Sequence, residues 1–115
     1  INSSYKVIRS FIAISDLVSV VLGIFSEKHQ GKLFIFDTAG EEEVEIGELA
    51  LKIKKELNSS ALIIRDEIEE HIEERYVGSR DRYHSYLSGL SIQEMSIEHQ
   101  IFCTSEYLRS LLKNN

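Results

Sequence analysis

Apolar residues recur at helical spacing through the middle of the chain, and this pattern constrains the fold more than any other feature. Successive members are separated by 4, 3, 4, 4, 3, 4, 4 and 4 residues. Such spacing places all of them on one face of an α-helix. The members are Ile46, Ala50, Ile53, Leu57, Ala61, Ile64, Ile68, Ile72 and Tyr76. The sequence therefore predicts one long helix from about Glu42 to Tyr76, roughly 50 Å in length.

A helix of that length is longer than one small domain needs. The chain has 115 residues, enough for a single domain, 1–115, with one core. Half of the apolar stripe would then be free to pack on another chain. We therefore expect self-association into a homo-oligomer through Ile53, Ile64, Ile68 and Ile72.

Acidic residues occupy the opposite face of the same predicted helix. From residue 41 to residue 80 the chain has 12 Asp and Glu against 6 Lys and Arg, whereas the remaining 75 residues hold 7 of each. Glu67, Glu70 and Glu74 lie on this outer face by their spacing. They are the residues that we expect to bind a protein partner with a basic surface.

The leading fold prediction is mainly α with a short β element, a helix-dominated α+β domain with a long central helix. The absence of proline favours helices. Helices are expected over Ser4–Gln30, Ser79–Ser88 and Ser91–Leu112, and the run KLFIFD, residues 32–37, predicts a strand. The alternative is an α/β fold, in which the chain breaks at residues 58–60 and strands form near 32–37 and 60–65.

Charge and hydropathy argue against two classes of partner. The formal net charge is −6, and nucleic-acid affinity comes mostly from Lys and Arg, so a nucleic-acid partner is not expected. The longest apolar run, Phe11–Phe25, contains Asp16 and two serines and is too short to span a bilayer, so no membrane association is expected.

The cysteine and histidine content predicts neither a disulfide nor a metal site. Cys103 is the single cysteine, which fits a reducing compartment and indicates a cytoplasmic protein. The four histidines, His29, His71, His84 and His99, are scattered and lack metal-ligand spacing. We therefore expect no metal and no cofactor.

The segment SRDRYHSY supplies the main alternative function. On a helix, Arg80 and His84 share a face, where the arginine could hold a phosphate and the histidine could move a proton. Arg80-Asp81 and His84-x-Tyr86 are loosely similar to the motif of the HEPN superfamily of small all-helical ribonucleases and nucleotide-transferring domains. This resemblance implies a metal-independent ribonuclease or nucleotide-modifying domain that uses Arg80, His84 and Tyr86.

A second alternative comes from residues 47–73, whose pattern is similar to a helix-turn-helix regulator. Its recognition helix would be acidic, and an acidic helix repels DNA phosphates. The prediction that best fits all these features is a non-enzymatic interaction or regulatory domain, with no catalytic residue assigned.

Overall fold

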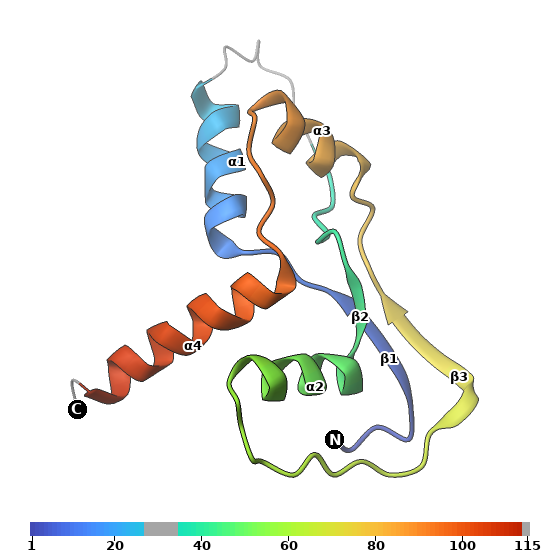
Figure 1. Ribbon diagram of the computed structural model, residues 1–115. Helices are drawn as coiled ribbons and strands as arrows, with labels where there is room; N and C mark the ends of the chain where they lie inside the picture. Colours follow the sequence, from blue (N-terminus) through green and yellow to red (C-terminus); the bar gives the residue numbers. More distant parts are fainter. Residues whose placement is uncertain (27–34, 114–115) are drawn as a thin grey trace.

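The computed structural model describes residues 1–26 and 35–113, except for the side chain of residue 70 (Figure 1). The described part contains four helices and a small three-stranded sheet, which confirms the predicted helix-dominated α+β fold. In chain order the elements are β1 (Tyr5–Ser10), α1 (Ile14–Ser26), β2 (Glu43–Glu45), α2 (Ile46–Glu56), β3 (Glu69–Tyr76), α3 (Asp81–Gly89) and α4 (Ile97–Lys113).

The sheet has the order β2-β1-β3, with β1 in the centre. β1 pairs antiparallel with β2, where Ile8 lies opposite Glu45, and parallel with β3, where Ile8 lies opposite Arg75. The segment YKVIRS contains tyrosine, valine and isoleucine, which are residues that favour strands. The predicted helix over Ser4–Gln30 is therefore wrong for β1, although the structure confirms it for α1.

The prediction of one long central helix is wrong, because α2 ends at Glu56. Asn58 adopts a left-handed backbone conformation with φ of 48°. Its N–H donates to the Lys55 carbonyl at 3.1 Å, and the Ser59 N–H donates to the Lys54 carbonyl at 2.9 Å. These two bonds form a Schellman motif, which closes the helix and redirects the chain.

The alternative α/β prediction locates this break correctly but misplaces the strands. Residues 60–65 are irregular, and the third strand is β3 instead. Of the predicted strand 32–37, residues 35–37 are irregular and residues 32–34 lie outside the described part of the chain. β3 forms because its backbone pairs with β1, and this tertiary pairing overrides a helical side-chain pattern.

The predicted helix-turn-helix is also wrong. Its recognition helix would begin at residue 60, where the chain is irregular, and would continue into β3. α3 agrees with the predicted helix Ser79–Ser88. A second left-handed residue, Ser91 with φ of 54°, ends α3 in the same manner as Asn58 ends α2. α4 begins at Ile97, six residues later than predicted, where the Ser96 hydroxyl accepts a hydrogen bond from the His99 N–H at 3.3 Å.

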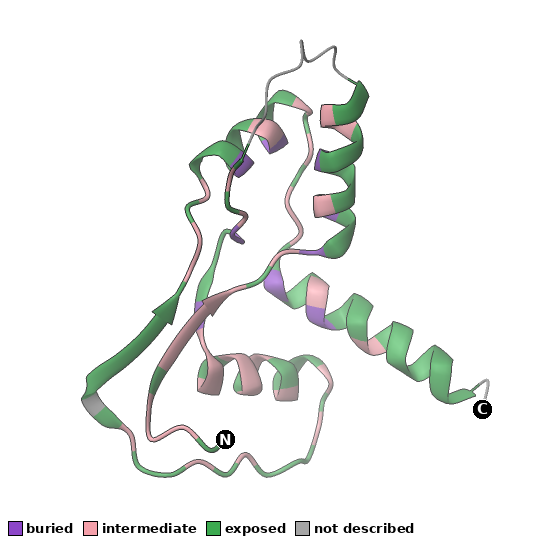
Figure 2. Cartoon of the chain, turned by 180° about the vertical axis from the view of Figure 1, so that it is seen from behind, coloured by how far each residue is buried: buried purple, intermediate pink, exposed green. Residues whose placement is uncertain are grey.

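The buried core is small. Val20 of α1 packs against Tyr83 and Leu87 of α3, and all three are at most 2% exposed. Figure 2 shows buried positions between α1 and α3 and in the first turns of α4, whereas the distal part of α4 is exposed. The radius of gyration is 17.4 Å, against about 13 Å for a compact domain of this length. The chain is thus open in shape, and its organisation as one domain stays a prediction.

Candidate apolar binding groove

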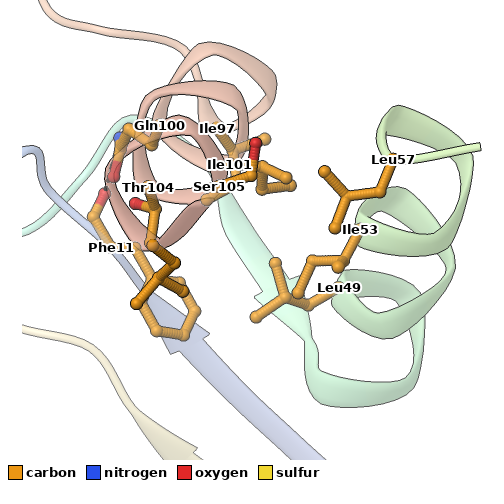
Figure 3. Close-up of a pocket in the computed structure, with 10 residues that line it drawn as sticks. Phe11, Leu49, Ile53, Leu57, Ile97, Gln100, Ile101, Thr104 and Ser105 are labelled. Carbon is orange, nitrogen blue, oxygen red and sulfur yellow. Dashed lines mark hydrogen bonds between the residues drawn. The ribbon is translucent and has the colours of Figure 1, made fainter. Parts of the chain in front are cut away.

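A groove lies between α2 and α4 and has a volume of about 320 Å³. Figure 3 shows Leu49, Ile53 and Leu57 projecting from α2 toward α4. The full lining comprises Phe11, Leu49, Ile53, Leu57, Ile97, Gln100, Ile101, Thr104, Ser105 and Leu108. None of these side chains is charged, so the groove can bind apolar surface but offers no acid, base or nucleophile activated by a base.

The α2 wall is formed by residues spaced four apart. Leu49, Ile53 and Leu57 lie one turn above another on a single helix face. The start of α2 is fixed by Glu45, whose side chain caps the helix by accepting a hydrogen bond from the Gly47 N–H at 2.7 Å. The wall is therefore held rigidly where α2 leaves the sheet.

A half-buried ion pair anchors the same helix end. Arg65 forms two 2.7 Å hydrogen bonds to the two carboxylate oxygens of Glu45, and it also donates to the Tyr5 carbonyl at 3.0 Å. The two side chains are 12% and 14% exposed. The hydrogen bonds from Arg65 lower the pKa of Glu45 to about 2, against the opposing effect of burial.

The α4 wall carries Ile97 and Ile101, which are 7% and 9% exposed, and Leu108, which is 53% exposed. Lys52 of α2 bridges the two walls: its Nζ lies 2.5 Å from Glu98 of α4 and 3.2 Å from Glu42. The hydrogen bond that Glu98 accepts from Lys52 is the main cause of the lowered pKa of Glu98. Residues 106–113 of α4 are all exposed.

The four isoleucines predicted to share one interaction stripe lie in three different settings. Ile53 forms part of the groove wall. Ile64 is exposed and Ile68 is half-buried, both in the irregular segment before β3, and Ile72 is an exposed residue of β3. No single helix carries them, so self-association through such a helix is not available to this fold.

The predicted acidic face is also divided. Glu67 is exposed in the irregular segment, and Glu74 lies in β3, where it forms an ion pair with Arg9. The side chain of Glu70 lies outside the described part of the structure.

The structure brings Arg80 and His84 together, as their spacing on α3 predicts. An Arg80 guanidinium nitrogen lies 3.3 Å from His84 Nδ1. The same nitrogen donates to a carboxylate oxygen of Glu94 at 2.7 Å, and the Glu94 side chain is only 9% exposed. Tyr86 packs its ring against Phe36 at 5.1 Å. Arg80 is thus paired with a carboxylate and the Tyr86 ring contacts Phe36, while the catalytic use of Arg80, His84 and Tyr86 stays a prediction.

Sequence reasoning missed most of the groove. The α4 wall and Phe11 come from segments far from α2 in sequence, and the sequence predicts a helix over Ser91–Leu112 without assigning any of its residues to a binding site. A usable signal was present, because Ile97, Ile101, Leu108 and Leu112 recur at helical spacing. The Glu45–Arg65 pair, 20 residues apart, has no comparable sequence signal.

None of the described helices has the length and apolarity to cross a membrane. Within residues 1–26 and 35–113, no cluster of three His, Cys, Asp or Glu side chains is arranged to hold a metal ion. Comparisons with protein-family models, curated proteins and solved structures find no match.

Proposed function

We propose that this chain is a non-enzymatic protein-interaction domain that binds an amphipathic helix with a basic polar face in the α2–α4 groove. The observation that carries the proposal is an uncharged groove open to solvent, lined from two helices, in a chain that buries few of its apolar side chains. Exposed apolar surface of this kind marks interaction sites in folded proteins.

The dimensions of the groove fit a helix. Ile97 and Leu108, which lie at either end of the α4 wall, are 11 residues apart, or about 16 Å along the helix axis. The apolar side chains of a bound helix at positions i, i+4 and i+7 span about 10 Å. Helix-in-groove recognition uses anchors at this spacing. The groove therefore has room for two to three such anchors.

The charge of the chain favours a basic partner. The net charge of the whole chain is −6, which gives the protein a negative long-range field, although α2 and α4 themselves hold five Lys and Arg against four Asp and Glu. A partner helix with lysines on its polar face would be attracted by this field, which raises the association rate and selects against acidic helices. The proposal keeps the basic partner that the sequence predicts, but the contact lies in the groove and not on the predicted acidic face.

The proposal can be tested with a synthetic helix of roughly 15 residues that carries leucine on one face and lysine on the other. Fluorescence anisotropy of the labelled peptide measures its binding. A peptide of the same pattern with glutamate in place of lysine, and a peptide of scrambled leucine and lysine order, serve as controls. We expect the amphipathic leucine–lysine peptide to bind at least about tenfold more tightly than either control.

A matched pair of variants locates the binding. Leu108→Asp adds a negative charge inside the groove, whereas Tyr107→Asp adds the same charge on the neighbouring exposed residue outside it. If attraction between opposite charges alone held the peptide, both variants would bind it more tightly. We expect Leu108→Asp to weaken binding at least about tenfold and Tyr107→Asp to preserve it. Equal binding by the two variants would refute the groove as the site.

A further inference from the structure

A second apolar surface lies on α1, on the side away from the core. Ile14, Val18, Val21, Leu22 and Phe25 are 73%, 47%, 41%, 64% and 82% exposed. They follow the spacing i, i+4, i+7, i+8 and i+11, which places them on one face of the helix. We name these five residues the α1 face.

The α1 face is free of charge. The only charged residue of α1 is Asp16, which is 6% exposed and points away, accepting a hydrogen bond from the Met95 N–H at 2.8 Å. Val20 also faces inward, against Tyr83 and Leu87 of α3. The helix therefore uses one side for the core of its own chain and leaves an exposed side (Figure 2), on which the α1 face lies beside the exposed serines Ser15, Ser19 and Ser26. Monomeric proteins rarely expose a face of this kind.

Four of the five residues of the α1 face are arranged symmetrically along the helix, and only Leu22 falls outside this symmetry. A twofold axis between Ser19 and Val20 sets residue i of one helix opposite residue 39−i of an antiparallel second helix. Ile14 then meets Phe25 of the second copy, and Val18 meets Val21 of the second copy. The bulky side chains fall at the two ends and the small valines at the centre, where two helices approach most closely. The spacing 14, 18, 21, 25 alternates 4, 3 and 4, which is the seam of helices crossing at about 20°.

We infer that two copies of this chain associate through their α1 faces as an antiparallel, twofold-symmetric pair. A closed twofold contact uses the same patch on both copies and needs no further surface. α1 has 13 residues and is about 20 Å long, so the patch is smaller than the roughly 800 Å² per partner of stable complexes. The expected dimer is therefore reversible and depends on protein concentration.

Sedimentation velocity over a roughly hundredfold range of protein concentration tests the association. We expect a concentration-dependent shift from monomer to dimer in the unmodified chain. Val21→Asp places a charge at the centre of the α1 face and should weaken dimerisation at least about tenfold. Ile64→Asp changes a 70% exposed isoleucine outside the α1 face and outside the groove, and it should leave dimerisation unchanged. A chain that stays monomeric throughout, or an equal loss in both variants, overturns the inference.

Cysteine cross-linking tests the antiparallel register, in a background where Cys103→Ser removes the native thiol. Ile14→Cys and Phe25→Cys are prepared as separate proteins. In the antiparallel pair, two copies of either position lie about 16 Å apart along the axis, so neither protein forms a disulfide with itself. A mixture of the two should form the mixed disulfide. Self-cross-linking of each protein alone would indicate parallel helices and overturn the inference. Peptide binding in the groove is measured independently of this result.

Discussion

Replacing Arg65 by methionine should destabilise the protein strongly at neutral pH and much less in acid. In the folded chain the pKa of Glu45 lies near 2, against an ordinary value of 4.5. This difference corresponds to about 3 kcal/mol of stability at neutral pH. Because Glu45 keeps 14% exposure, and because the N–H groups of Gly47 and Val7 still donate to it, we expect Arg65→Met to cost about 2 kcal/mol.

The pH dependence identifies the cause. A carboxyl group with a lowered folded-state pKa stabilises the protein above its unfolded pKa, and this contribution is lost as the pH falls from about 4.5 to about 2. Urea unfolding followed by circular dichroism, at pH 7 and at pH 3, gives the two free energies. The difference between Arg65→Met and the unmodified chain should shrink by more than about 1 kcal/mol at pH 3. An equal difference at both pH values would refute the ion pair as the source of the stability. Arg65→Lys retains the positive charge but cannot form the two parallel hydrogen bonds, so its free energy of unfolding at pH 7 should lie between those of Arg65→Met and the unmodified chain.

Three further residues give predictions from local geometry, measured by the same unfolding assay at neutral pH and, for Tyr83, also at alkaline pH. Asn58→Ala should cost about 1 kcal/mol while Asn58→Gly should be neutral or stabilising, because the left-handed backbone at this position, φ 48°, disfavours a Cβ atom; equal effects would contradict the Schellman account. Gly40→Ala should destabilise by at least about 2 kcal/mol, since its Cβ would lie 1.9 Å from the Phe11 carbonyl oxygen, whereas Gly89→Ala, with open space around it, should be tolerated or stabilising. Tyr83→Phe should leave stability nearly unchanged at pH 7, because the buried hydroxyl has no hydrogen-bond partner among the described residues. Burial raises the pKa of Tyr83 to about 12 from 10, so the unmodified chain should lose stability as the pH rises from 10 to 12, and Tyr83→Phe should lack this loss.

The helical elements were predictable where local signals and tertiary contacts agree. The apolar periodicity of α1 and the turn-forming residues around α3 are sufficient to find both helices. The same reasoning failed after Leu57, because the stripe continues in phase through Asn58 while the backbone does not. Asn58 is itself a helix stop signal, since asparagine tolerates the left-handed conformation. Weighing that residue above the periodicity would have ended α2 at the correct place.

The sheet and the groove could not be predicted in the same way. β3 has the sequence EEHIEERY, and its glutamates are poor strand formers. It forms because its backbone makes hydrogen bonds to β1, which lies more than 60 residues earlier in the chain. The groove requires Phe11, α2 and α4 to meet, and their separations along the chain exceed the range of any periodicity. Of the residues expected to bind a partner, only Ile53 lines the groove, since its helix face was predicted correctly up to the end of α2.

The binding of a basic amphipathic helix to the α2–α4 groove is the central claim, and amide chemical-shift mapping tests it most directly. The ¹⁵N-labelled chain is titrated with the leucine–lysine peptide, and the amide shifts are followed residue by residue. We predict that the largest shifts fall on residues that line the groove, from Leu49 in α2 to its C-cap residue Leu57, and from Ile97 to Leu108 in α4. Shifts confined to the glutamates of β3, or no saturable shifts at all, would contradict the proposed function.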